Sequence, residues 1–281
     1  MGPVDLHVHS TASDGEASPS DIVQRASAVG LTAVALTDHD TTAGVAEAER
    51  AAGTGLRVIA GCEFSVAASW GEMHLLAYFL PADDPALERF LATQRSRRAG
   101  RGEEIVRRLN KLGVALALED VHSEAGAAAL GRPHIARAMV ARGLARDVSA
   151  AFERYLGAGR PAFVPKTLPS VAEVTALVRA AGGVSAAAHL KERGTADALR
   201  ALREAGVDAV EVLHPSHDDS IRRRIQRAAN AAGLLPTGGS DWHGDLSVRD
   251  DRGALGGMNV PAEWLDGIEA VHARRSGRAA A

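Results

Sequence analysis

The sequence predicts an α/β protein built on a parallel sheet and interrupted once by helices. Short apolar runs of strand type alternate with helical stretches along the 281 residues, a pattern typical of a barrel or of a doubly wound sheet. The expected strands cover residues 4–6, 32–37, 57–60, 73–79, 184–188, 209–213 and 234–237. Residues 84–169 show helical patterns and no strand pattern. This length suffices for one large domain with an insertion.

Several of the predicted helices have clear start and stop signals. A helix is expected to begin after Ser18, where a proline occupies the first helical position, and to end at Gly30. Another should begin at Ser170, because Glu173 three residues later completes a capping box, and should end at Gly182. We therefore predict a barrel-type unit and a helical insertion, over residues 1–84 with 165–281 and over residues 85–164 respectively.

The predicted insertion differs in charge from the rest of the chain. Residues 95–166 hold 14 Lys and Arg against 7 Asp and Glu, a net charge of +7, so the remainder carries −10 of the total −3. This asymmetry favours an anionic substrate gathered by the insertion. For Arg107, Arg108 and Lys111, a solvated helix face is an equally good interpretation.

Composition excludes several other classes of protein. The single cysteine, Cys62, permits no intrachain disulfide and favours a reducing cytosol. No apolar run approaches the roughly 18 to 20 residues that a membrane span needs. The net charge is negative and no reading helix or RNA-binding signature appears, so we expect no duplex DNA partner.

Histidines and carboxylates recur where the predicted strands end or begin. His7 and His9 alternate along the first strand, so their side chains share one face and suit a common ligand. The other residues of this kind are Asp14, His39, Glu63, His74, His189, Asp241 and His243. Because active sites of such barrels form at the rim where the strands end, we expect these nine side chains to converge there.

Imidazole and carboxylate ligands suit Zn²⁺, Mn²⁺ and Fe²⁺. Nine ligands exceed what one ion takes, so the sequence predicts two or three divalent ions, with at least one carboxylate bridging two of them. Clusters of this kind activate water and neutralise the charge that develops on a phosphoryl oxygen.

The motifs DLHVHSTASDG, LTDHD, GCEFS, EMHLL, AAAHL and GGSDWHG, in this order, resemble the PHP (polymerase and histidinol phosphatase) family over nearly the whole chain. The resemblance implies a distorted (β/α)7 barrel and metal-dependent phosphoesterase activity. It also implies three ligand sets, which are His7, His9, Glu63 and Asp241 for the first ion, Glu63, His74 and His189 for the second, and Asp14, His39 and His243 for the third.

The segments GRPHIARAMV, YLGAGRPAFVPK and HPSHDD further resemble the small PHP phosphoesterases that act on nucleotides. The resemblance suggests Arg132, His134 and Lys166 as phosphate-binding residues, since they can form charge-assisted hydrogen bonds. Ser216 and His217 are weaker candidates for substrate binding. Alternatively, Arg132 and His134 only cap the helix that begins there.

The predicted function is hydrolysis of phosphate esters of small nucleotides, such as nucleoside 3′,5′-bisphosphates or short 5′-phosphorylated RNA, by metal-activated hydroxide. The predicted catalytic residues are His7, His9, Asp14, Glu63, Asp241 and His243. Two alternatives keep the same metal chemistry, namely histidinol-phosphate phosphatase and cyclic-phosphate phosphodiesterase. A third alternative is a non-catalytic PHP module kept for structure.

Overall fold

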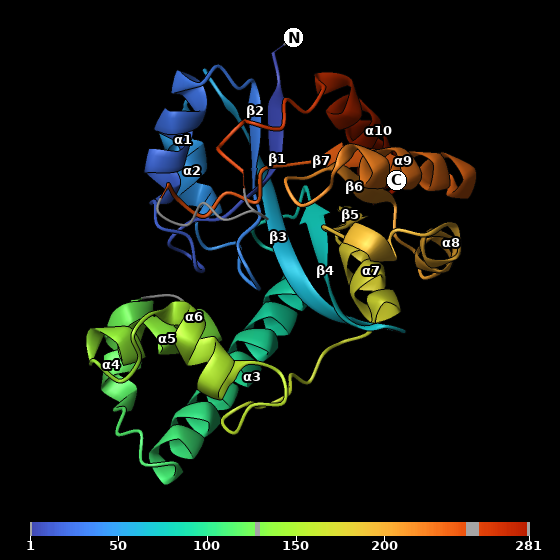
Figure 1. The fold of residues 1–281 in the computed structure, drawn as a ribbon. Coiled ribbons are helices and arrows are strands. Elements are labelled where there is room, and N and C mark those ends of the chain that lie inside the picture. The colour runs from blue at the N-terminus through green and yellow to red at the C-terminus, as the bar shows by residue number, and fades with distance from the viewer. Residues whose placement is uncertain (1, 127–129, 246–252, 280–281) are drawn as a thin grey trace. The chain divides into compact units, whose positions relative to one another are not determined.

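A computed structural model describes residues 2–126, 130–245 and 253–279 (Figure 1). The chain divides into two compact units. We call Met1–Glu88 with Leu168–Ala281 the barrel unit, and Arg89–Thr167 the insertion unit.

The barrel unit contains one seven-stranded sheet in which the strands follow one another in chain order. The strands are β1 (Val4–Val8), β2 (Ala33–Leu36), β3 (Arg57–Ala68), β4 (Gly71–Tyr78), β5 (Val184–Ala187), β6 (Ala209–Leu213) and β7 (Leu235–Gly238). Each begins within two residues of its predicted position. The third strand continues eight residues beyond the predicted end.

The prediction of a wholly parallel sheet is wrong at one strand, because β4 runs antiparallel to both β3 and β5. Only residues 69 and 70 connect β3 to β4. So short a connection can join antiparallel strands only, since a parallel pair needs a crossover of a dozen or more residues.

The two edges of the sheet approach each other and nearly close a barrel. Val8 forms a parallel bridge with Trp242, just beyond β7, and the His9 amide donates to the Trp242 carbonyl over 2.9 Å. The expectation of a distorted (β/α)7 barrel is confirmed.

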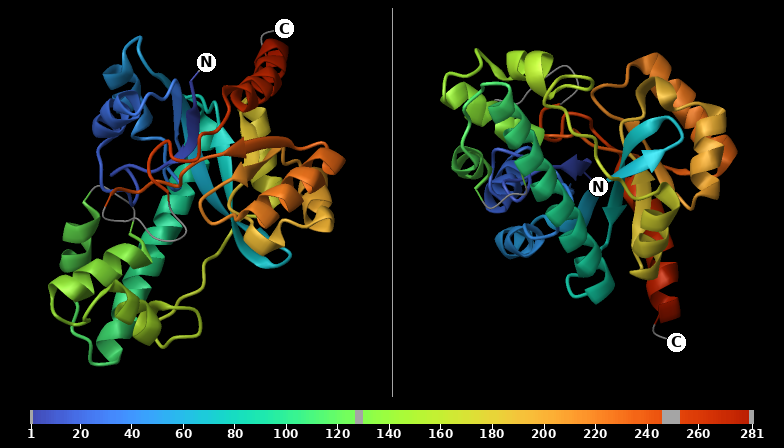
Figure 2. Two further views of the ribbon diagram at one scale, coloured as in Figure 1. Left: turned by 45° about the horizontal axis from the view of Figure 1, so that its top comes forward. Right: turned by 90° about the horizontal axis from the view of Figure 1, so that it is seen from below.

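Helices cover the outside of the barrel (Figures 1 and 2). Helix α2 packs against β3, α7 against β3 and β5, and α9 against β6 and β7. The barrel-unit helices are α1 (Pro19–Ala28), α2 (Val45–Ala52), α7 (Val171–Ala180), α8 (Ala196–Glu204), α9 (Asp219–Ala232) and α10 (Ala262–Ala279), with a short 3₁₀ turn η2 (Lys191–Arg193). The predicted caps are present, since Ser18 accepts a hydrogen bond from the Asp21 amide and Ser170 accepts one from the Glu173 amide.

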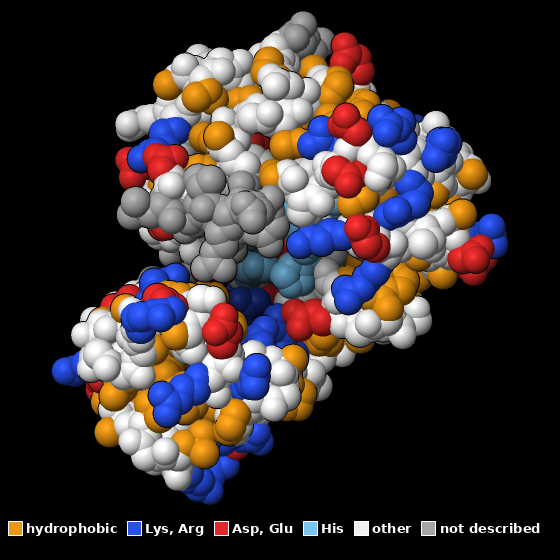
Figure 3. All heavy atoms as spheres, viewed as in Figure 1, with side chains coloured by type: hydrophobic (Ala, Val, Ile, Leu, Met, Phe, Trp, Pro, Cys, Tyr) orange, Lys and Arg blue, Asp and Glu red, His pale blue; other side chains and the backbone are white. Residues whose placement is uncertain are grey.

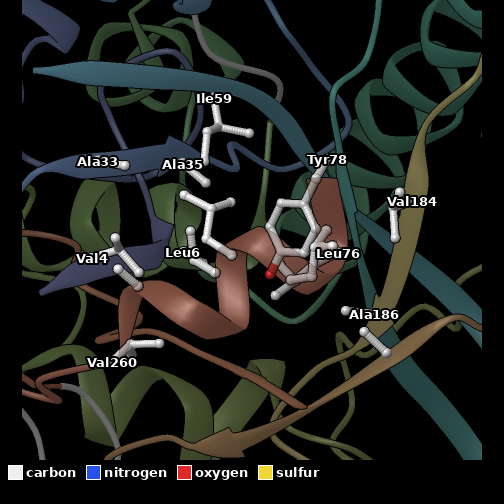
Figure 4. Close-up of a cluster of buried hydrophobic side chains, with 14 of the residues drawn as sticks. Val4, Leu6, Ala33, Ala35, Ile59, Leu76, Tyr78, Val184, Ala186 and Val260 are labelled. Carbon is white, nitrogen blue, oxygen red and sulfur yellow. The ribbon is translucent and has the colours of Figure 1, made fainter. Parts of the chain in front are cut away.

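Apolar side chains from β1 to β6 fill the barrel interior and pack against α10. Figure 4 shows Leu6, Ile59, Leu76 and Tyr78 pointing toward one another from the three strands β1, β3 and β4. All four are almost fully buried. This apolar layer gives the polar residues at the rim a rigid and dry support.

A register shift in β1 explains how the strand supplies both core and polar side chains to the barrel interior. Between Asp5 and Val8, β1 has one residue more than β2. Leu6 belongs to the interior cluster and Val8 to the cluster beneath α1 and α2. A bulge of this kind changes the face that the following side chains occupy, so that Leu6 and His7 both serve the inside of the barrel.

The insertion unit is helical and has a hydrophobic core of its own, which includes Ile105, Leu109, Val121 and Met139. Its elements are α3 (Pro85–Lys111, which starts in the barrel unit), α4 (Leu118–Ala125), α5 (Arg132–Ala141), α6 (Val148–Ala151) and a π-helical turn η1 (Phe152–Leu156). Its described residues include no strand, as the sequence predicted. Across the described chain, every helix is too short or too polar to span a bilayer.

Candidate metal centre

All nine predicted metal ligands lie at one rim of the barrel unit, where they form overlapping groups. Four groups contain predicted ligands alone and hold their nitrogen and oxygen atoms within 4.8 Å of one another. These are His9 with Asp14, His39 and His243, then His7 with His9 and Glu63, His39 with Glu63 and His74, and His7 with His189 and Asp241.

Glu63 on β3 is the centre of this arrangement, because five imidazoles surround its buried carboxylate. Oε1 lies 2.8 Å from His74 Nδ1 and 3.1 Å from His189 Nε2. Oε2 lies 3.1 Å from His9 Nε2, 3.2 Å from His39 Nδ1 and 3.5 Å from His7 Nε2. A carboxylate that faces nitrogens with both oxygens has the geometry expected of a group bridging two cations.

The direction of β4 brings His74 into this cluster. His74 lies near the start of its strand, opposite Ser65 of β3. Because β4 is antiparallel, its start lies at the rim where the parallel strands end. The Ala188 amide donates to the His74 carbonyl over 3.1 Å, which places His74 next to the residue before His189.

Asp241, beyond β7, contacts two of the histidines that surround Glu63. Its Oδ1 lies 3.3 Å from Nε2 of both His7 and His9. The close approach depends on Gly239, because a Cβ there would lie 2.4 Å from the His7 Cβ. Asp241 itself has a φ of 51°, a left-handed conformation that non-glycine residues adopt mainly at functional sites.

Asp14, His39 and His243 form the third predicted ligand set. Asp14 Oδ1 lies 3.3 Å from His243 Nε2, and the His243 ring stacks on His9 with centroids 4.1 Å apart. Asp14 and His39 share one group with both of these histidines.

The close packing of acids and imidazoles shifts their pKa values strongly. Burial raises the pKa of Glu63, but His74, His39 and His7 lower it well below its usual range. Burial lowers the pKa of His7, yet Glu211, Asp241 and Glu63 raise it well above its usual range. For His9 the same opposition, led by burial and then by Asp241 and Glu63, gives a pKa raised to about 9. The carboxylates therefore stay charged and attract cations.

The donor set fits divalent metal ions. Among the described residues, His9 Nδ1, His39 Nδ1 and His243 Nε2 are buried and have no hydrogen-bond partner. Each lies 3.2–3.8 Å from a carboxylate oxygen of Glu63 or Asp14 without hydrogen-bond geometry. Because buried polar atoms are normally satisfied, unpartnered imidazole nitrogens that face carboxylates in this way indicate shared cations.

Three further acids support the cluster, and two of them, Glu211 and Asp5, were not predicted as site residues. Glu211 on β6 accepts from His7 Nδ1 over 2.9 Å and from the His189 amide over 2.7 Å. Asp5 accepts from the amides of Ser240 and Gly256. The only available signal was an acidic residue inside an otherwise apolar strand. Asp38 accepts from the amide and hydroxyl of Ser10 and from the hydroxyl of Ser13, which holds the loop after β1 in place.

The predicted substrate-binding residues are divided between the insertion unit and the barrel unit. Arg132 and His134 lie in the first turn of α5 in the insertion unit, where His134 Nδ1 accepts from the Gly131 amide over 3.0 Å. The Arg132 guanidinium lies 5.6 Å from the ring centres of Phe152 and Phe163. Lys166 is half-buried near the end of the same unit.

Ser216 and His217 follow β6 in the barrel unit. His217 is buried, and both of its ring nitrogens bond backbone atoms: Nδ1 lies 3.1 Å from the Val212 carbonyl and Nε2 accepts from the Lys191 amide over 3.1 Å. This arrangement gives His217 a structural role and leaves its predicted substrate contact without support. Ser216 Oγ lies 2.8 Å from His214 Nδ1.

A pocket opens onto the cluster within the barrel unit. Its lining consists of His39, Glu63, His74, His189, Lys191, His214, Asp241 and His243. Histidine side chains are visible in pale blue at the surface in Figure 3. The barrel and this histidine–carboxylate rim define the class of metal-dependent hydrolases built on a (β/α) barrel.

Comparison with known proteins identifies the family within this class. Residues 5–110 match the family model of the PHP domain. The chain is 35% identical over 245 residues to a 5′-3′ exoribonuclease of Haemophilus influenzae, covering 85% of this chain and 89% of the relative. It is 32% identical over 255 residues to a 3′,5′-nucleoside bisphosphate phosphatase of Chromobacterium violaceum, covering 86% and 88%.

The fold agrees with these relatives. A crystal structure assigned as a metal-dependent phosphoesterase from Bifidobacterium adolescentis superposes with a TM-score of 0.85 at 32% identity, covering 96% of this chain and 98% of that chain. The protein belongs to the PHP family and is a phosphoesterase, which confirms the family and the enzyme class predicted from its motifs.

Proposed function

We propose that this phosphoesterase releases phosphate from small nucleotides that carry two phosphates, above all nucleoside 3′,5′-bisphosphates, or acts on short 5′-phosphorylated RNA. The observation that carries the proposal is the Glu63 carboxylate among five imidazoles at a barrel rim. Two relatives with this substrate chemistry in their names cover most of the chain.

We propose two or three resident divalent ions, Mn²⁺, Fe²⁺ or Zn²⁺. His7, His9, Glu63 and Asp241 would hold the first ion. Glu63, His74 and His189 would hold the second, and Asp14, His39 and His243 the third. When bound, such ions act as Lewis acids on a phosphoryl oxygen and generate a nucleophile from water at neutral pH.

The chain's own residues fix the geometry in which this chemistry proceeds. Glu211 accepts the Nδ1–H of His7, so that Nε2 is the nitrogen left for a metal ion once its proton is displaced. The same carboxylate anchors the backbone of His189. Both carboxylate oxygens of Glu63 face the cluster, and burial of His7, His9 and Glu63 keeps bulk water away from it.

The net charge of +7 over residues 95–166 supports a substrate with more than one phosphate. We propose that Arg132, His134 and Lys166 bind the phosphate that is not hydrolysed. The Arg132 Nη1 donates to the Leu156 carbonyl over 3.3 Å and the guanidinium lies over two aromatic rings. These contacts hold the guanidinium in one orientation, as two-point recognition of a phosphate requires.

The test is phosphate release from adenosine 3′,5′-bisphosphate by Mn²⁺-loaded protein, beside AMP, histidinol phosphate, a 2′,3′-cyclic nucleotide and a short 5′-phosphorylated RNA. Asp14→Ala serves as the blank, because it removes a carboxylate from the third ligand set. We expect the bisphosphate to be preferred over AMP, and all turnover to disappear in the variant.

Each other outcome selects an alternative. Equal or better turnover of histidinol phosphate would overturn the role given to the insertion and leave the metal site standing. Preference for the cyclic nucleotide would identify a phosphodiesterase. Inactivity on every substrate, with loss of fold on metal removal, would identify a non-catalytic module. Location in the cytoplasm and the lack of a duplex DNA partner stay predictions from the sequence.

A further inference from the structure

Two of the eight residues that line the rim pocket have no place among the predicted ligands. These are Lys191, in the turn η2 after β5, and His214, directly after β6. Lys191 is held in a left-handed conformation with φ 53°, where the His217 ring accepts its amide hydrogen and Arg224 donates to its carbonyl. Because His217 also contacts the His214 ring, at a centroid distance of 5.4 Å, it joins the two loops.

His214 is 1% exposed, so its polar atoms need partners within the protein or in a ligand. Its Nδ1 accepts from the Ser216 amide over 3.1 Å. A backbone N–H can only donate, so Nδ1 carries a lone pair and no hydrogen. The ring hydrogen therefore resides on Nε2. The backbone of Ser216 fixes this tautomer.

The Nε2–H group has no hydrogen-bond partner among the described residues. Its nearest charged neighbour is Asp241, whose Oδ2 lies 3.6 Å away, beyond hydrogen-bond distance. Burial raises the pKa of Asp241, but His7 and then His214 lower it well below its usual range, so this contact is a favourable one. The His214 ring lies 5.3 Å from the ring of His189, centroid to centroid. A buried donor left unpaired costs about 1–3 kcal/mol, so an unpaired N–H on a residue that lines the pocket indicates an acceptor supplied by a ligand.

His217, three residues along, shows what a purely structural histidine looks like in this loop. Both of its nitrogens bond backbone atoms, and the pocket lining does not include it. His214 differs because only one of its nitrogens bonds the backbone and because the residue belongs to the pocket lining. Since a metal ligand needs a lone pair and Nε2 carries a hydrogen, the tautomer excludes His214 as a ligand through that atom.

We propose that the Nε2–H of His214 donates a hydrogen bond to a non-bridging oxygen of the phosphoryl group under attack. The inference rests on the proposed phosphoesterase chemistry of the same pocket. Negative charge on such an oxygen is stabilised by a donor that is already in place, because no reorganisation is needed during the reaction. His214 acts as a fixed donor and transfers no proton, so no bond to its nitrogen breaks.

Two variants distinguish the loss of the Nε2–H donor from damage to the loop that holds His214. His214→Asn keeps an acceptor near the position of Nδ1 for the Ser216 amide and removes the donor at Nε2. His214→Gln reaches about as far as Nε2 and keeps an N–H there. His122→Gln is the matched control, because His122 is exposed on α4 and has no assigned role.

The measurements are kcat and KM on adenosine 3′,5′-bisphosphate, the Mn²⁺ content, and the affinity for inorganic phosphate by calorimetry on Mn²⁺-loaded protein. We expect His214→Asn to lower kcat by about 100-fold, to weaken phosphate binding several-fold and to keep its Mn²⁺. His214→Gln should recover at least ten-fold of the lost kcat. The control should match the wild type.

Unchanged kcat and phosphate affinity in His214→Asn would overturn the proposal. Loss of Mn²⁺ in both variants would also overturn it, because His214 would then act by positioning Asp241. If the wild type fails to hydrolyse the bisphosphate, the proposed substrate is wrong. The phosphate titration of wild type against His214→Asn still decides the role of His214 in that case.

Discussion

The barrel rim and the insertion unit are both rich in charged residues, but the rim buries its carboxylates among histidines, whereas the insertion pairs its charges at the surface. At the rim, Glu63 is 1% exposed, and five imidazoles face its carboxylate. In the insertion, Glu104 is paired with Arg107 and Arg108 at the surface. Burying charge is costly unless a partner compensates for it, so the rim shows the clearer functional signature.

Several arginines of the insertion have structural partners. Arg108 also donates to the Phe163 carbonyl, and Arg101 donates to the Val164 carbonyl, which attaches that segment to α3. Arg142 pairs with Asp120. The net charge of +7 over residues 95–166 therefore overstates the number of cationic side chains that are available to bind a substrate. For Arg107 and Arg108, these contacts favour the solvated helix face over phosphate binding.

The largest effect is expected at the rim, from Glu63→Gln. The change removes the negative charge that five histidines surround while it preserves the shape of the side chain. We expect metal content to fall and kcat/KM to drop by more than about 10³-fold. Metal analysis together with steady-state kinetics checks this, and a variant that keeps both metal and turnover would remove Glu63 from the centre of the site.

Metal affinity should rise with pH. Without metal, His7 has a pKa well above its usual range and His9 has one of about 9, so both are protonated at neutral pH. Metal binding must displace these protons. Between pH 8 and pH 6, the affinity for Mn²⁺ should fall about ten-fold per pH unit for each proton released.

Calorimetry in buffers of different ionisation enthalpy counts the protons released on Mn²⁺ binding. Release of none, together with an affinity independent of pH, would contradict the charge state assigned to His7 and His9.

A smaller effect is expected from Glu211→Gln, because Glu211 contacts the predicted ligand His7 and is not a predicted ligand itself. Burial raises the pKa of Glu211, but His7 and His214 lower it to about 2, so the native group is a carboxylate. The amide weakens the hold on the His7 Nδ1–H and on the His189 backbone. We expect a 10- to 100-fold loss of metal affinity, measured by competition with a chelator, with the fold retained. An unchanged affinity would show that His7 orients itself without Glu211.

The smallest functional effect is expected in the insertion, and it tests whether charge there acts on substrate. Arg132→Ala should raise KM for the bisphosphate about ten-fold, since a charge-assisted hydrogen bond contributes about 1.5–3 kcal/mol, and should leave KM for AMP unchanged. Arg107→Ala is the matched control, because its guanidinium pairs with Glu104 at the surface and exposed pairs contribute little. Equal effects of the two variants would reduce Arg132 to general charge or helix capping.

Much of the fold could be predicted from local sequence signals. Alternating apolar runs located all seven strands, and serine caps with glycine stops located α1 and α7. The histidines and acids of the rim were also predictable. His7 and His9 share a face because side chains alternate along a strand, and such residues next to strand ends meet at one rim.

Only the tertiary structure decided the direction of β4, which brings the start of a strand, and with it His74, to the rim. It also decided the roles of Glu211, His214 and His217, which depend on partners up to 204 residues away in the chain. Sequence periodicity reports which face a side chain occupies. It does not report which atom that side chain meets or which ring nitrogen keeps its hydrogen, because packing between distant strands and loops determines both.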